Sequence, residues 1–208
     1  MWYSILVAVL VAYLLGNLNG AVCISNLVAK EDVRSRGSGN AGLTNFIRNY
    51  GAKSALGVIL VDGGKAALAC YMGGLLLRPY GMYLEGMCIA GLAMSIGHDF
   101  PALLGFKGGK GILSGAVTAL VIDWRIGLII FVVFAVAYGL TQYVSLGSVL
   151  GALSTSICFA VFYYNRPLVM IPGVIIGLLA VYLHKANIVR LIKGNERKTN
   201  LFGKGSKE

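Results

Sequence analysis

The sequence predicts an all-α integral membrane protein with about seven transmembrane helices, and three observations support this prediction. Hydrophobic residues make up 57% of the 208 residues and charged residues only 12%, which is too apolar for a soluble domain of this length. The apolar residues form seven separate stretches. The basic residues lie mainly in the short segments between those stretches, which is typical of membrane protein loops.

The seven apolar stretches are the expected membrane spans. The fourth is short against the roughly 20 residues that a spanning helix needs, so we expect this helix to begin inside the glycine-rich loop before it. The first has no basic segment ahead of it and no small-residue cleavage pattern, so we expect a retained helix and not a signal peptide. The stretches are 3–29, 52–77, 82–96, 112–122, 126–140, 144–163 and 168–183.

Orientation follows from the basic residues. With seven spans, the first loop, the third loop and the C-terminal segment share one side, and these segments hold most of the Lys and Arg residues. The positive-inside rule makes that side cytoplasmic, with the N-terminus outside and the C-terminus in the cytoplasm. The net charge of +10 therefore indicates topology and not nucleic-acid binding. We expect residues 1–196 to form a single membrane-embedded domain and 197–208 a polar cytoplasmic tail.

The cysteines and histidines argue against metal and thiol chemistry. Each cysteine lies in an apolar stretch without Cys-x-x-Cys spacing, which favours buried reduced thiols over a disulfide or a metal site. The two histidines are His98 and His184, and neither lies four residues ahead of an aspartate. A local His-Asp acyltransfer pair is therefore absent, and we expect neither a metal nor a cofactor.

The first motif is the loop RGSGNAGLTN at 36–45, which ends near Arg48. Glycines allow several backbone N–H groups to converge on one anion, and the hydroxyl, amide and guanidinium groups add donors and charge. The pattern formally matches G-x-G-x-x-G, but it follows a membrane helix and not a strand, which argues against a dinucleotide site. The alternative is a flexible polar connector, but this would not explain why so many polar side chains lie in the loop. We therefore expect a phosphate-binding loop.

The second motif runs from Gly97 to Gly111 and reads GHDFPALLGFKGGKG. A glycine-rich turn that opens a helix offers free N–H groups at the positive end of the helix dipole, and Lys107 and Lys110 supply charge. It is not a Walker A loop, because Gly111 stands where Ser or Thr would bind magnesium. The alternative is that the two lysines only anchor a helix end.

Two further motifs contain polar residues at helix ends. If the last helix continues, His184 and Asn187 lie three residues apart on one face, although capping or interfacial roles remain open. Ser145, in the sequence YVSL, does not by itself indicate a function. Asp62 and Lys65 can pair within the second span, either for function or as a structural ion pair.

Together the four motifs resemble the bacterial glycerol-3-phosphate acyltransferases that use acyl phosphate as donor, the PlsY family. They occur in that family's order, over the chain up to about Glu196. The resemblance implies seven helices in the bacterial inner membrane, an active site facing the cytoplasm, and a role in phospholipid biosynthesis. It also implies transfer of a fatty acyl group from acyl phosphate to the 1-hydroxyl of glycerol 3-phosphate, which gives lysophosphatidic acid and phosphate.

The resemblance also assigns the site residues by motif position. It implies no cofactor, no metal, no nucleic acid and no obligate protein partner, so the partners are the two substrates and membrane lipid. The expected catalytic residues are Ser38, Lys110, His184 and Asn187, and the expected substrate-binding residues are Gly37, Gly39, Asn40, Thr44, Asn45, Arg48, Lys107, Gly108, Gly109 and Ser145.

The chemistry of the donor agrees with this assignment. Acyl phosphate already has a good leaving group, so the protein mainly aligns two anions and needs no nucleophile of its own. His184 would orient or deprotonate the acceptor hydroxyl, Asn187 would hold it, and Lys110 would take the departing phosphate. The rival class is a membrane transporter for organic phosphates. The absence of an internal repeat and the placement of every polar motif at one face argue against it.

Overall fold

The structure is a computed structural model that describes residues 1–199, and this part of the chain forms helices and short turns without a β-strand. Positions 200–208 of the expected polar tail lie outside the described residues. The helices are α1 (Trp2–Asn17), α2 (Gly20–Ala29), α3 (Leu43–Tyr50), α4 (Ala52–Leu77), α5 (Tyr83–Asp99), α6 (Ile112–Ile122), α7 (Trp124–Thr141), α8 (Val144–Phe162), α9 (Pro167–Leu183) and α10 (Lys185–Ile192).

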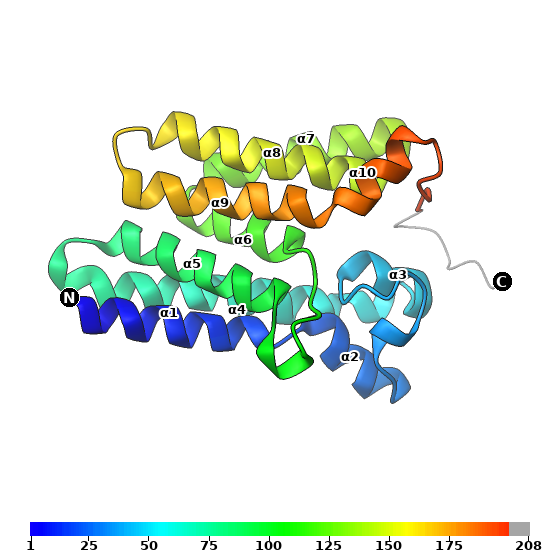
Figure 1. Ribbon diagram of the computed structural model, residues 1–208, viewed down its shortest axis with the longest axis horizontal. Coiled ribbons are helices and arrows are strands. Elements are labelled where there is room, and N and C mark those ends of the chain that lie inside the picture. The colour runs from blue at the N-terminus through cyan, green and yellow to red at the C-terminus, as the bar shows by residue number, and fades with distance from the viewer. Residues whose placement is uncertain (200–208) are drawn as a thin grey trace.

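The long helices form two groups (Figure 1). Helices α1, α4 and α5 pack together, and α8 packs against α7 and α9. Helix α6 lies between the groups and contacts helices of both. The helices α2, α3 and α10 gather at one end of the bundle with the long loop before α6, and the N-terminus lies at the other end. The polar motifs therefore meet at one end of the bundle.

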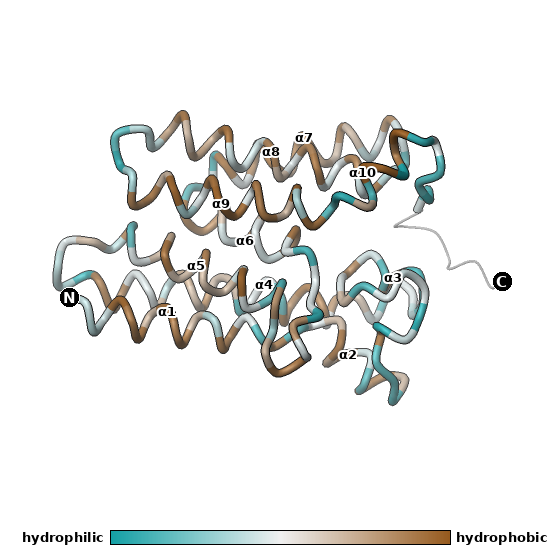
Figure 2. Tube along the Cα trace, viewed as in Figure 1, coloured by the Kyte–Doolittle hydropathy of each residue, from teal (hydrophilic) through white to brown (hydrophobic). Residues whose placement is uncertain are grey.

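The helices have the length and composition of membrane spans. Within residues 1–199, five segments are long and apolar enough to cross a bilayer, and the bent pair α9 and α10 adds a sixth. Hydrophobic residues lie along the helices and hydrophilic residues gather at the bundle ends (Figure 2). The predicted all-α membrane class is confirmed. The expected span that this count leaves out is the fourth, α6, whose 11 residues rise only about 16 Å against roughly 30 Å of hydrocarbon.

The first apolar stretch is one candidate span, Trp2–Ala29, but its helix is interrupted. The first stretch is two helices, α1 and α2, separated at Leu18 and Asn19, where the Asn19 side chain caps α2 by accepting from Val22 N at 3.0 Å. Helix α6 begins at Ile112, so the prediction that it starts inside the glycine-rich loop was wrong. The reason is Gly111, whose φ of 65° is left-handed and ends the loop before the helix begins.

The last helix does not continue straight past Leu183, so the condition under which His184 and Asn187 would share one face of a straight helix is not met. Helices α9 and α10 meet at His184 with a bend of 55°. The His184 ring bonds to the Ala180 carbonyl at 2.8 Å, and the backbone N of His184 lies 3.2 Å from the same oxygen. A side chain that enters the backbone hydrogen-bond ladder is a known cause of helix bends. His184 and Asn187 therefore lie at the bend and in the first turn after it.

Close helix packing explains several glycines. A Cβ on Gly97 of α5 would lie 2.2 Å from the Tyr13 carbonyl oxygen of α1, so the two backbones touch at this crossing. The predicted Asp62–Lys65 pair is present in α4, with 2.8 Å between Lys65 Nζ and Asp62 Oδ1. All four cysteines are free, and Cys23 is only half-buried where we expected full burial.

Candidate active site

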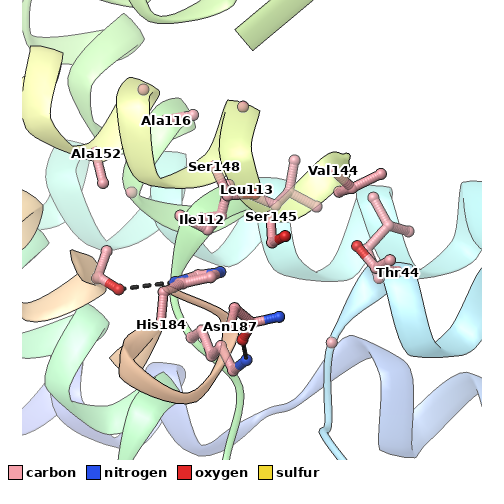
Figure 3. Close-up of a pocket in the computed structure, with 18 of the residues that line it drawn as sticks. Thr44, Ile112, Leu113, Ala116, Val144, Ser145, Ser148, Ala152, His184 and Asn187 are labelled. Carbon is pink, nitrogen blue, oxygen red and sulfur yellow. Dashed lines mark hydrogen bonds between the residues drawn. The ribbon is translucent and has the colours of Figure 1, made fainter. Parts of the chain in front are cut away.

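One large cavity of about 850 Å³ opens at the end of the bundle where the polar motifs meet. Its mouth is polar and is formed by the loop 37–42, helix α3, Lys110 and the start of α10. Its inner part is apolar and lies between α6, α7, α8 and α9, with Leu113, Ala116, Leu120 and Ile130 in the lining. Figure 3 shows His184 and Asn187 on one side of this space and Ser145 and Ser148 on the other. A charged head and an apolar tail could occupy it together.

Most of the predicted site residues line this cavity. Three do not: Lys107, Gly108 and Gly109 lie in the loop behind Lys110. The backbone N–H groups of Gly108 and Gly109 donate to the carbonyls of Asp99 and His98 at 3.2 and 3.1 Å, so they hold the loop against the end of α5. The predicted residues in the lining are Gly37, Ser38, Gly39, Asn40, Thr44, Asn45, Arg48, Lys110, Ser145, His184 and Asn187.

Asn45 holds the first glycine-rich loop in shape. Its Nδ2 donates to the carbonyls of Val33, Arg36 and Asn40 at 3.0 to 3.1 Å. Its Oδ1 accepts from the backbone N of Ser38 at 3.0 Å. The side chain of Asn45 is therefore engaged by the loop itself, and this arrangement leaves Ser38 exposed at the cavity mouth.

Arg48 joins the first loop to the C-terminal segment. Its Nε donates to Thr199 Oγ1 at 2.9 Å, and Thr199 is buried. The Thr199 backbone is held by α7, because its carbonyl accepts from Tyr138 Oη at 2.9 Å and its N–H donates to the Gln142 carbonyl at 3.1 Å. These contacts hold the Arg48 guanidinium at the mouth of the cavity.

Lys110, Asn187 and Glu196 form a hydrogen-bonded chain. Lys110 Nζ donates to Asn187 Oδ1 at 2.5 Å, and Asn187 Nδ2 donates to Glu196 Oε1 at 2.8 Å. Arg190 Nε donates to the other Glu196 oxygen at 2.7 Å. Burial raises the pKa of Glu196, but the hydrogen bonds from Asn187 and Arg190 outweigh it, so the pKa lies below its ordinary value. Glu196 therefore stays ionised and fixes the orientation of Asn187.

The sequence interpretation missed the role of Glu196. It placed the residue only at the end of the resemblance. The signal was weak: one carboxylate in a basic segment, nine residues after Asn187. The contact depends on the chain folding back after α10, which residue spacing does not reveal.

The cavity mouth is electropositive. Arg48, Lys110, Arg190 and Arg197 line it, and the Glu196 carboxylate lies among them. Burial lowers the pKa of Lys110, and the nearby Arg190 charge lowers it further. An anion that binds here offsets the repulsion between Lys110 and Arg190. It also replaces the hydrogen bonds to water that the Lys110 ammonium group loses on burial. Within residues 1–199, no group of three His, Cys, Asp or Glu side chains is placed to hold a metal ion.

The His184 ring is held in one tautomer. Its Nδ1 lies 2.8 Å from the Ala180 carbonyl oxygen, and the ring is buried. Because a carbonyl only accepts, Nδ1 carries the proton. A neutral His184 therefore keeps a lone pair on Nε2, which is the form that can accept a proton from a hydroxyl group. The hydrogen bond that fixes this tautomer is drawn in Figure 3.

The family model for glycerol-3-phosphate acyltransferase matches residues 6–194 of the chain. The chain belongs to the glycerol-3-phosphate acyltransferase family. A glycerol-3-phosphate acyltransferase of Finegoldia magna is 39% identical, over 91% of this chain and 93% of that protein. One from Thermoanaerobacter pseudethanolicus is 37% identical, over 94% of this chain and 96% of that protein.

Solved structures of a glycerol-3-phosphate acyltransferase agree with this assignment. The crystal structure of PlsY (YgiH), an integral membrane glycerol 3-phosphate acyltransferase, in its glycerol 3-phosphate form matches with a TM-score of 0.85 and 31% identity, over 96% of this chain and all (100%) of that one. Its lysophosphatidic acid form matches with a TM-score of 0.82 and 30% identity, over 95% and 96%. The predicted PlsY family is confirmed, so the chain is a multi-pass membrane acyltransferase that acylates glycerol 3-phosphate.

Proposed function

We propose that the acyl donor is acyl phosphate and that the acceptor is the 1-hydroxyl of glycerol 3-phosphate, so that the products are lysophosphatidic acid and phosphate. One observation carries this proposal: a cationic mouth opens directly into an apolar space within one cavity. Acyl phosphate needs both parts, because its phosphate is anionic and its chain is apolar. The ring of His184 bonds to a backbone carbonyl and not to a carboxylate, which suits a donor that needs little help from a strong base.

The transfer needs no protein nucleophile. The oxygen of the acceptor hydroxyl attacks the carbonyl carbon of acyl phosphate and forms the ester bond. The bond between that carbon and the phosphate oxygen breaks, and the phosphate leaves with the electron pair. The hydroxyl proton passes to the phosphate, either directly or through His184 Nε2. Atoms and charge balance without water, metal or cofactor.

The polar residues of the cavity have different proposed roles toward the donor and the acceptor. Lys110 and the loop around Ser38 bind the donor phosphate and stabilise the charge that develops on it as it leaves. Arg48 and Arg190 bind the phosphate of the acceptor, and Asn187 orients the acceptor hydroxyl next to His184. Lys107, Gly108 and Gly109 shape the loop that carries Lys110.

Related side chains complete the pocket. The aliphatic faces of α6 to α9 hold the acyl chain. The hydroxyl groups of Ser145 and Thr44 and the amide of Asn40 add donors at the mouth. Gly37 and Gly39, both with positive φ, allow the first loop to turn tightly beneath the phosphates.

We also propose seven membrane crossings, with α6 as the short one and the N-terminus outside. Two features support this topology: the polar motifs share one end of the bundle, and the basic loops lie at that end. When the protein spans the inner membrane of a bacterial cell in this orientation, that end of the bundle faces the cytoplasm. Residues 1–196 form one membrane-embedded domain in this proposal, and Thr199 of the following segment packs onto it.

The donor is tested with purified protein in detergent. We expect lysophosphatidic acid from palmitoyl phosphate and glycerol 3-phosphate, and none from palmitoyl-CoA and glycerol 3-phosphate. Addition of EDTA should leave the rate unchanged. Equal activity with palmitoyl-CoA, or loss of activity in EDTA that magnesium or zinc restores, contradicts the proposal. Uptake of glycerol 3-phosphate into proteoliposomes without lysophosphatidic acid would favour the transporter alternative.

A further inference from the structure

A buried ion pair lies against the break between α1 and α2. A break in a membrane helix leaves unpaired carbonyl groups where the first half ends and an unpaired N–H group where the second half begins. Lipid cannot form hydrogen bonds with either. Lys65 Nζ donates to the carbonyl of Gly16 in the last turn of α1 at 3.2 Å and to the carbonyl of Leu18, the residue that caps α1, at 2.5 Å. Asp62 Oδ1 accepts from Gly20 N, the first group of α2, at 3.0 Å. One pair of side chains thus satisfies both ends of the break.

The pair is deeply buried and well formed. Asp62 and Lys65 lie one turn apart on α4, with 2.8 Å between their charged atoms and side chains only 4% and 3% exposed. An apolar pair of similar size could fill the same volume, but it could not bond to the free backbone groups. The two charged groups therefore bond to the backbone groups at the break as well as to each other.

The break connects the pair to the first glycine-rich loop. Asn19 lies at the break, and its Oδ1 caps α2 by accepting from Val22 N at 3.0 Å. Its Nδ2 donates to the Ala41 carbonyl at 3.0 Å. Ala41 belongs to the loop that carries Ser38, so the position of the break sets the position of that loop.

His98 connects the pair to the second glycine-rich loop. Lys65 Nζ lies 2.8 Å from His98 Nδ1, and because an ammonium group only donates, Nδ1 accepts. The His98 carbonyl accepts from Gly109 N at 3.1 Å. A Cβ on Gly109 would lie 2.2 Å from His98 Nε2 and 3.1 Å from the Ala41 carbonyl oxygen. The two loops therefore meet at Gly109, next to Lys110.

We propose that Asp62 and Lys65 are positioning residues for the acyl transfer, which hold the loop of Ser38 and the loop of Lys110 at a fixed separation around the substrates. The inference rests on the proposed function, since it assigns those two loops to substrate phosphates. Asp62 and His98 reach the wall of the same cavity, but their polar contacts lead to the helix break and the loops. The pair acts through Asn19 and His98 and does not touch the reacting atoms.

The first test compares Lys65→Met with Glu85→Gln. Lys65→Met keeps an unbranched side chain but removes every donor to the break and to His98. Glu85→Gln is the matched control, because it breaks a different ion pair, Glu85–Arg166 at 2.6 Å, which lies away from both loops. We expect Lys65→Met to lower kcat at least tenfold and to raise KM for glycerol 3-phosphate. Glu85→Gln should stay within twofold of the parent in both constants.

A purely structural role predicts a different result. It lowers the yield of folded protein but leaves kcat and KM per folded molecule unchanged, so rates are normalised to the monodisperse fraction. Parental kcat and KM in folded Lys65→Met overturn the inference. Inactivity of the parent with acyl phosphate instead overturns the proposed function, so the two failures are distinguishable.

A second variant decides the question if Lys65→Met does not fold. Gly109→Ala leaves the ion pair intact and inserts a methyl group where the two loops meet. Gly64→Ala is its control, because a Cβ at Gly64 meets no atom within 4 Å. We expect Gly109→Ala to lower kcat at least tenfold and Gly64→Ala to match the parent. Parental kcat in Gly109→Ala shows that the separation of the loops does not matter and overturns the inference.

Discussion

Lys110 is the cation whose environment most clearly limits the pH range of the reaction. Its charged form binds phosphate, and burial and the Arg190 charge lower its pKa. A lowered pKa means that the ammonium loses its proton at a lower pH than an exposed lysine does. We therefore expect kcat/KM to fall as the pH rises through this value, below the ordinary lysine range near 10.4.

The Lys110→Arg variant checks this assignment. Guanidinium stays charged across the accessible pH range, so the alkaline fall in kcat/KM should disappear even if the maximal rate drops. Lys110→Ala should lose roughly a hundredfold in kcat. An alkaline limb that is the same in Lys110→Arg and in the parent assigns the titration to another group.

His184 is expected to act on the acceptor and not on the donor. Replacing it by Gln keeps a side chain that can hydrogen-bond but removes the lone pair that accepts a proton. We expect acyl transfer to slow by roughly 10²-fold to 10⁴-fold and the acidic limb of the rate profile to disappear. Binding of a non-hydrolysable acyl phosphate analogue should change little. A persisting acidic limb would show that His184 only orients the hydroxyl and that a substrate phosphate oxygen takes the proton.

Ser38 is expected to contribute a hydrogen bond to the transferred phosphate. Its backbone is held by Asn45, so Ser38→Ala should remove the hydroxyl without changing the loop. We expect a loss of roughly a hundredfold in kcat with unchanged yield. Ser35→Ala is the matched control, because that hydroxyl lies outside the cavity and bonds to the Asp32 carbonyl at 2.7 Å. Similar rates for both variants rule out the role of Ser38.

At the residue scale, the sequence predicted which side chains reach the cavity better than it predicted what each polar group bonds to. Ser38, Lys110 and His184 were predicted from motifs, and the structure brings them to one cavity. Asn45 was predicted beside them, yet its polar atoms bond to the loop. Such a difference cannot be predicted from residue type, since an amide suits substrate and backbone equally well.

At the element scale, the crossing of α1 and α5 is the contact least tolerant of added volume. A methyl group on Gly97 would collide with the Tyr13 carbonyl, and backbone cannot move aside cheaply. We expect Gly97→Ala to destabilise the fold by about 1 to 3 kcal/mol, measured as a lower Tm in detergent. Gly64→Ala adds the same methyl group in open space and should keep or raise the Tm. Equal Tm values for both variants contradict this close crossing.

The sequence predicted the helices but not their interruptions. Apolar length located the spans, because burial in lipid requires long apolar stretches. The break before α2 and the bend at His184 depend on partners from elsewhere in the chain or on side-chain bonds to the backbone. Helix α3 was missed because it is short and follows a loop whose glycines suggest irregular structure.

At the scale of the whole molecule, the proposed topology predicts which residues water-soluble reagents reach from each side. Asn49, Arg166 and Asn195 are exposed, and each can be replaced by cysteine. A membrane-impermeant maleimide applied to intact cells should label position 166 and leave positions 49 and 195 unlabelled until the membrane is opened. The parent protein corrects for labelling of its own cysteines. Labelling of 49 and 195 from opposite sides would place the motifs on two faces and exclude a single site.

In the proposed reaction, the acyl group passes directly between two substrates that are held together in one cavity. The most direct test mixes purified protein with acyl phosphate and radiolabelled glycerol 3-phosphate and measures lysophosphatidic acid and phosphate in the same samples. We predict equal amounts of the two products, each formed only when both substrates are present. A burst of phosphate from acyl phosphate alone, accompanied by acylated protein, would contradict direct transfer.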